Sequence, residues 1–368
     1  MDEVDLTETA LEALGADVPS VVHALRAGTG LPDALAVALG TDLANRATST
    51  PETAAAAVAL AAHPVDPGLL AGIARGMSGS TRVDRSERLG VAYLSDYAPI
   101  GSAHLAIPAG AEAAAVSLVT LGAPPAFDAV ARSVGATSVA SSTLRYLTAM
   151  LRGGVTGALI DLHLGVDLDL ATANATAHAI VATAAHFDLH VVVRTFRIRV
   201  PLGRAFGAAL EPLEAAQIID GGGPIAVRRF VDQTIAELVR LDGRNASGAS
   251  TAHRTPSVET VDVDAPVRRA ITSETAGSVL RLDAATVVAV SRLVSGVRVV
   301  RTVGEHVGRN DTILEVLGDD DITVERAVDA LRGAWSVGPG SAPGPDPTPI
   351  SVVRTADQFA DSPLFFGS

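Results

Sequence analysis

The sequence predicts an α/β protein with three parts: a small all-helical lobe, an α/β domain with a parallel or mixed sheet, and a C-terminal α+β domain rich in strands. A length of 368 residues is enough for more than one core. A composition of 48% hydrophobic and 19% charged residues is typical of globular chains. The pattern also changes near residue 83, from continuous helical periodicity to short apolar runs alternating with Ala-rich helices. We therefore expect units at 1–76, 80–203 and 255–335, with a Pro/Gly-rich tail at 338–368.

Residues 1–76 have the pattern of a helical lobe. Thr50 followed by Pro51 is a typical helix start, because Thr caps free backbone N–H groups and Pro is tolerated in the first turn. Asp66 followed by Pro67 begins another helix in the same way.

The next unit contains a predicted βαβ motif. Apolar runs of strand length at 158–164 and 189–195 are separated by one Ala-rich helical segment, which favours two parallel strands. Sheets of this kind bind ligands beyond the carboxyl ends of their strands. His163 and Arg194 lie near those ends, so we expect a site there.

A loop and helix follow in the segment PLGRAFGAALEPLEAAQIIDGGGP, residues 201–224. Gly221 to Gly223 end the helix, and Arg204 lies just before it. A cation beside free helix N–H groups can hold an anion, although an exposed arginine in a tight turn explains the pattern as well. We expect the helices from about 205–243 to pack back on the helical lobe.

The last part of the chain is predicted to be rich in strands. Residues 244–257 are small and polar, which is typical of a linker, and strand-like runs with turn residues follow up to a closing helix near 335. The tail at 338–368 is expected to be extended or disordered.

Charge and composition exclude several functions. All 28 basic residues are arginine, so Schiff-base and P-loop lysine chemistry is absent, and the lack of cysteine removes thiolate chemistry. A net charge of −13 without a basic stripe argues against nucleic-acid binding. No leader or membrane-spanning run is visible, which predicts a cytoplasmic protein without a membrane partner. The histidines lack metal-binding spacing, so no metal is expected.

Three patches in order resemble the thymidine phosphorylase and archaeal AMP phosphorylase family of nucleoside pentosyltransferases. They are PLGRAFGAALEPLEAAQII; LRGGVTGALIDLHLG, in which Asp161 and Gly165 match the family's strand; and VGEHVGRNDTILEVLGDDD in the C-terminal part. The resemblance spans about residues 15 to 335 and implies a homodimer with a cleft between the helical lobe and the α/β domain. It also implies attack of inorganic phosphate on the anomeric carbon of a nucleoside or nucleotide, with no other cofactor.

The family's Lys-His-Ser-Thr-Gly-Gly phosphate loop has a degraded counterpart in VDRSERLGVAYLSDYAPI. Val83 and Asp84 match, and Arg85 stands for the lysine, whereas the Ser-Thr-Gly-Gly core is missing. By this resemblance Arg85, Ser86 and Ser95 would bind phosphate, since arginine can hold it bidentately. A solvated charged turn is the alternative interpretation.

Other family positions are also replaced. The segment PAGAEAAAVSLVTLGAPP offers only Ser117 and Thr120 as hydroxyl contacts to substrate. Arg145 stands where the family has a residue that holds the base, and Thr137 and Asp169 lie near places where the archaeal branch has a catalytic aspartate and a lysine. His163 is a candidate ligand contact or proton donor, although a lone histidine is more often hydrogen-bonded in place.

Two hypotheses follow. In the first, the chain is a divergent pentosyltransferase in which Arg85, Arg145 and Arg204 replace lysines at a phosphate site and Arg145 and His163 serve catalysis. In the second, it is a catalytically degenerate homologue that binds a nucleotide or sugar phosphate or pairs with an active relative. Cations converging on one cleft would favour the first, and loss of the phosphate loop favours the second.

Overall fold

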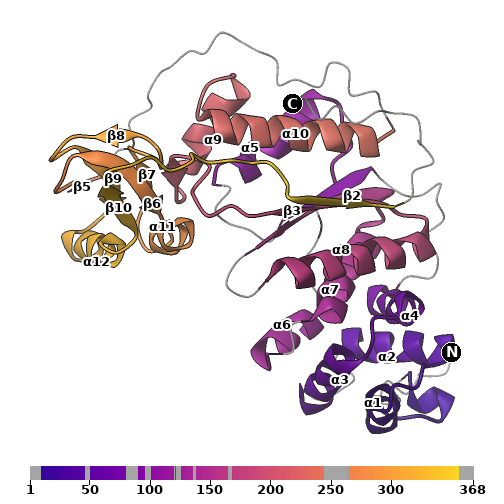
Figure 1. The fold of residues 1–368 in the computed structure, drawn as a ribbon. Helices are drawn as coiled ribbons and strands as arrows, with labels where there is room; N and C mark the ends of the chain where they lie inside the picture. Colours follow the sequence, from indigo (N-terminus) through magenta and orange to yellow (C-terminus); the bar gives the residue numbers. More distant parts are fainter. Residues whose placement is uncertain are drawn as a thin grey trace.

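The computed structural model describes residues 10–45, 50–79, 90–95, 101–119, 121, 126–135, 138–164, 168–243, 263 and 265–355 (Figure 1). The described chain has the predicted fold class, with a helical lobe, an α/β domain and a β-rich domain in that order (Figure 1). Within these residues, no helix combines the length and apolar character needed to cross a membrane.

The helical lobe begins with a 3-10 turn, η1 (Glu12–Leu14), and continues with α1 (Val18–Arg26), α2 (Asp33–Asn45), α3 (Thr50–Ala62) and α4 (Pro67–Ser78). The sequence sets two of these starts. Asp17 and Ser20 form a reciprocal capping box at α1, and Asp66 accepts a hydrogen bond from Gly68 N at 2.9 Å at the start of α4.

Helices α2 and α4 approach each other backbone to backbone. A Cβ added at Gly40 would overlap the Ile73 carbonyl oxygen, and one added at Gly76 would overlap the Val37 carbonyl oxygen. Glycine is therefore required at this crossing because a side chain would not fit between the two helices, and not because the backbone turns there. Close helix approach explains how a chain with only 3% aromatic residues fills the core of this lobe.

The α/β domain is built on a sheet with the strand order β1-β2-β3-β11. Strands β1 (Val91–Ser95), β2 (Gly157–His163) and β3 (His190–Phe196) are parallel, and α8 (Leu170–Ala184) connects β2 to β3, as the βαβ pattern predicts. All seven residues of β2 are buried, because helices cover both faces of the sheet.

Alternate residues of the strands face the two helical layers. Ile160 and Leu162 join the core formed with the helical lobe, α6 (Ala126–Ser133), α7 (Val139–Gly153) and α8. Leu159 joins a second core formed with α5 (Ala103–Ala113), α9 (Glu211–Ile219) and α10 (Ile225–Leu241) on the opposite face (Figure 1). The period of two along a strand produces this division.

The position of α9 and α10 differs from the sequence prediction that helices from about 205–243 pack on the helical lobe. In the structure they pack on α5, and α10 also covers β1 and β2. Phe230 and Val231 of α10 are buried in this second core. An amphipathic pattern shows that one face of a helix is buried, but it does not identify the surface that buries it.

The C-terminal domain contains two antiparallel sheets. It comprises β5 (Val267–Thr272), β6 (Gly277–Leu282), α11 (Ala284–Ser291), β7 (Gly296–Val299), β8 (His306–Val307), β9 (Thr312–Gly318), α12 (Asp321–Leu331) and β10 (Trp335–Gly338). One sheet has the order β10-β6-β8 and the other β4-β7-β9-β5. Strand β4 (Ala205–Phe206) belongs to residues 201–210, which we call the linking segment, so this segment adds a strand to the C-terminal domain. The linker predicted at 244–257 lies outside the described residues.

Part of the predicted tail forms a strand that pairs with the central sheet. Residues 339–350 run from β10 back to the α/β domain, where β11 (Ser351–Arg354) pairs antiparallel with β3 at the edge of the central sheet (Figure 1). The tail is thus extended, as expected, but one of its segments is a strand of the sheet. Residues 356–368 lie outside the described part of the chain.

Candidate functional site

The carboxyl ends of the parallel strands bring two predicted residues together. Ser95 ends β1 and His163 ends β2, and Ser95 Oγ lies 3.4 Å from His163 Nε2. His163 is 7% exposed, and its ring stacks on Phe196 with the ring centres 5.3 Å apart. The pair lies at the edge where such sheets bind ligands, and the stacked ring is held in a defined orientation.

The same strands and α10 also carry a polar group that we call the strand-end cluster: the half-buried Tyr93 and the buried Asp161, Arg194 and Thr234. Arg194 donates from Nε and Nη2 to the two carboxylate oxygens of Asp161, each at 2.7 Å. Arg194 Nη2 also donates to Thr234 Oγ1 at 2.8 Å, and Tyr93 OH donates to Asp161 Oδ2 at 2.9 Å. The geometry is a bidentate arginine–carboxylate pair supported by two further hydrogen bonds.

The pKa values of Arg194 and Tyr93 are both raised in this cluster. Burial acts to lower the pKa of Arg194, but Asp161 and the neighbouring groups more than offset this and raise the pKa above the usual value. Burial, together with the nearby Asp161 carboxylate, raises the pKa of Tyr93 well above its usual value. Arg194 therefore stays charged and Tyr93 stays a neutral donor, which suits them to a structural role in the sheet.

Sequence reasoning missed this cluster, although a signal was present. Asp161 and Arg194 are charged residues inside apolar strand runs, and they occupy paired positions on neighbouring strands. A carboxylate and a guanidinium inside two adjacent buried strands are rarely left unpaired.

Ser117 is separated from the strand-end pair. Its carbonyl oxygen accepts from Val91 N at 2.9 Å, at the amino end of β1, and Ser95 lies at the other end of the same strand. Five residues of strand put these ends about 13 Å apart. Ser117 therefore does not join Ser95 and His163 in one group.

The other predicted residues are distributed over the fold. Arg145 lies on α7, where its guanidinium carbon is 4.5 Å from the centre of the Tyr146 ring. Arg85, Ser86 and Thr120 lie outside the described residues, so their roles stay predictions.

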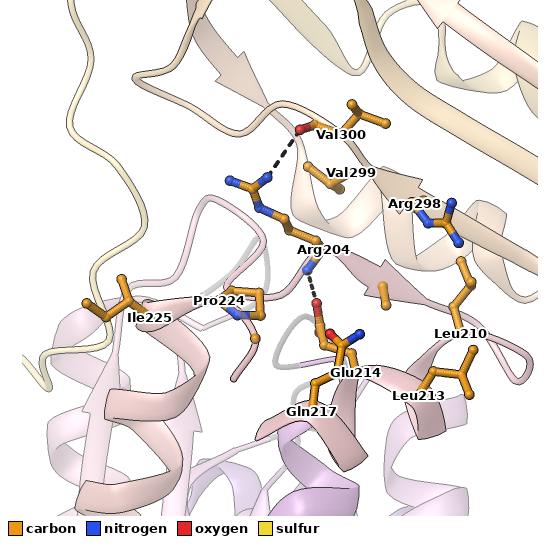
Figure 2. A pocket seen from close by; sticks show the side chains of 12 residues that line it. Arg204, Leu210, Leu213, Glu214, Gln217, Pro224, Ile225, Arg298, Val299 and Val300 are labelled. Atoms are coloured by element: carbon orange, nitrogen blue, oxygen red, sulfur yellow. Dashed lines mark hydrogen bonds between the residues drawn. The ribbon is translucent and has the colours of Figure 1, made fainter. Parts of the chain in front are cut away.

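Arg204 faces the C-terminal domain. Its Nη1 donates to the Val300 carbonyl oxygen at 3.3 Å (Figure 2). Its Nη2 forms an ion pair with Glu305. Its backbone N donates to Glu214 Oε1 at 2.7 Å, and Ser102 Oγ donates to Glu214 Oε2 at 2.5 Å. Burial raises the pKa of Glu214, while the Ser102 and Arg204 hydrogen bonds oppose that rise.

The Arg204 side chain lines a cavity of about 810 Å³, which we call the linking cavity. Its walls come from the linking segment, from α9, from the start of α10 and from β7 (Figure 2). No group of three or more His, Asp or Glu side chains suited to a metal ion occurs in the described part of the chain.

Comparisons with known proteins give likenesses among solved structures and none among sequences. No family model and no curated protein sequence matches the chain. Among solved structures, it is similar to the anthranilate phosphoribosyltransferase from Thermus thermophilus, at 16% identity and a TM-score of 0.45, over 63% of this chain and 93% of that one.

Proposed function

We propose that the chain keeps the scaffold of a nucleoside pentosyltransferase and acts as a binding or partner subunit for a nucleotide or sugar phosphate, without phosphorolysis. The scaffold part of this proposal rests on the three sequence patches and the helical, α/β and β-rich parts in that order. The implied homodimer stays a prediction from the resemblance.

The observation that supports the non-catalytic part of the proposal is that Arg194 is buried and its donors are already bound within the protein. Phosphorolysis needs donors aimed at a phosphate beside the anomeric carbon. Arg194 is at the right edge of the sheet, but its side chain is 5% exposed and is bound to Asp161 and Thr234. Arg204, another candidate, points toward Val300 and Glu305. Among the described residues at the strand ends, a ligand would therefore meet the Ser95–His163 pair, whereas the charge of Arg194 is already neutralised by Asp161.

One observation favours the second candidate function, phosphorolysis. Ser95 and His163 are adjacent at the carboxyl edge of the sheet, where a hydroxyl donor and a proton-transfer group would be needed. In that case Arg85 and Ser86 would complete the phosphate site.

Two measurements on the purified full chain test the proposal. We expect no phosphate- or arsenate-dependent base release from AMP, thymidine, uridine or guanosine, with an active nucleoside phosphorylase assayed alongside as the positive control. We also expect calorimetric titration to detect binding of AMP or ribose 5-phosphate. Base release that requires phosphate and is lost in His163→Gln would establish the second candidate instead.

A further inference from the structure

Two arginines follow β3 directly beyond the carboxyl edge of the central sheet. Strand β3 ends at Phe196, and Arg197 and Arg199 are the first charged residues after it. Parallel sheets bind their ligands beyond this edge. The two side chains therefore belong to the part of the fold where a ligand is expected.

The burial pattern places both arginines on one side of the chain. Phe196 and Ile198 are 0% and 3% exposed and belong to the core formed with α5, α9 and α10. Arg197 and Arg199, which alternate with them, are exposed. This alternation is that of an extended chain, in which residues two apart point the same way and lie about 7 Å from each other. Two long guanidinium side chains at that spacing can reach the same phosphate.

The backbone beside these arginines is held on both sides. The Phe196 carbonyl oxygen accepts a hydrogen bond from Leu164 N, just after β2, at 2.8 Å. The Thr195 carbonyl oxygen accepts one from Ile350 N, just before β11, also at 2.8 Å. Leu202, a few residues further on, is 2% exposed. Because the segment is already ordered, little conformational entropy is lost when a ligand binds to it.

The charges of this pair are not compensated within the described part of the chain. No ion pair or side-chain hydrogen bond between described residues involves Arg197 or Arg199, whereas Arg194 of β3 is bound to Asp161 and Thr234. In a chain with a net charge of −13, two neighbouring uncompensated cations create a local positive potential that attracts an anion.

The pair also lies on the opposite face of the strand from the Ser95–His163 pair. His163 stacks on Phe196, on the side of α10. Arg197 is the next residue and alternates to the other side, the one on which Val193 of β3 joins the core with α8. An anion held there is separated from the Ser95 hydroxyl and the His163 imidazole, which agrees with binding without phosphorolysis.

We infer that Arg197 and Arg199 form the phosphate-binding pair of this chain and hold the phosphate of a small phosphomonoester between their guanidinium groups. This inference rests on the proposed function, because it names the residues that bind the nucleotide or sugar phosphate. Arginine matches phosphate geometry well, since it presents two parallel donors.

The test titrates AMP into the full chain by calorimetry, with Arg197→Gln and Arg199→Gln as the variants. Each variant is expected to weaken AMP binding about 10-fold or more, the size expected for loss of a charge-assisted hydrogen bond. Titration with adenosine, which lacks the phosphate, should give the same result for the variants and the unmodified chain. Arg292→Gln is the matched control, because Arg292 is also exposed but lies at the end of α11 in the C-terminal domain. It removes the same charge and should leave AMP binding unchanged.

The outcomes separate the inference from the proposed function. Weaker AMP binding in both variants, with unchanged binding in Arg292→Gln, supports the pair. Unchanged AMP binding in both variants would overturn the pair while leaving the proposed function intact. An equal loss in Arg292→Gln would also overturn it, because a general effect of charge would then explain the result. If neither AMP nor ribose 5-phosphate binds the unmodified chain, both proposals fail. Both substituted side chains are exposed, so the fold should be kept, and circular dichroism of each variant checks this.

Discussion

Arginine–carboxylate pairs occur both in the strand-end cluster and beside the linking cavity, but they differ in access to water. The side chains of Arg194 and Asp161 are 5% and 0% exposed, whereas those of Arg204 and Glu305 are 42% and 32% exposed. A buried pair loses its hydration and must satisfy every donor internally, while an exposed pair is weak and can exchange partners. The same kind of pair is therefore dry and fixed inside the sheet, and reached by water beside the cavity.

The largest effect is expected from breaking the strand-end cluster. Asp161→Asn keeps the side-chain shape but leaves Arg194 buried without its counter-charge, which should lower the free energy of unfolding by about 3–5 kcal/mol. Arg298→Gln, which breaks the partly exposed pair with Glu315 beside the cavity, should cost about 1 kcal/mol or less. Urea titrations followed by circular dichroism measure both. Similar losses in the two variants would contradict the difference in role that burial implies.

A smaller effect is expected where the tail meets α10, the helix that covers the strand-end cluster. Arg354 of β11 donates to Glu237 of α10 at 2.6 Å, and Glu237 is 6% exposed. Arg354→Ala should cost about 1–2 kcal/mol and speed hydrogen exchange in residues 350–355, because it removes a charge-assisted bond from the edge strand. Arg240→Ala is the control: Arg240 pairs with the same Glu237 but is more exposed. Equal exchange rates in the two variants would show that the ion pair does not hold β11.

The smallest effect concerns the pH response beside the cavity. Burial raises the pKa of Glu214 above its usual 4.5, with the Ser102 and Arg204 hydrogen bonds opposing. A carboxyl with a raised folded-state pKa binds its proton more tightly when folded, so its favourable contribution is full below the unfolded pKa and is lost as pH rises through the folded pKa. The stability of the unmodified chain relative to Glu214→Gln should therefore increase as pH falls from neutral toward 4.5 and then level off. Thermal melts of both proteins over this range measure the difference, and parallel curves would contradict it.

Much of the local structure could be predicted from the sequence because it depends on neighbouring residues. The Asp66–Pro67 helix start and the strands separated by an Ala-rich helix are encoded by capping groups and by periodicity. The carboxyl edge of the sheet was also predictable, since parallel strands align their ends, and Ser95 and His163 do meet there.

Contacts between distant segments could not be predicted in this way. The sequence around Arg204 predicts a cation before a helix, but the partners of this residue, Val300 and Glu305, lie about a hundred residues later. The pairing of β11 with β3 joins residues more than 150 positions apart, and nothing in a Pro/Gly-rich tail specifies that edge.

The sequence by itself determined the fold class, the helix starts, the strand runs and the loss of lysine and thiol chemistry. Only the tertiary structure decided which arginines are neutralised inside the sheet, which face of it α9 and α10 cover, and where a cavity forms. The physical reason is that capping and periodicity act within a few residues, whereas burial depends on surfaces brought together by the whole chain.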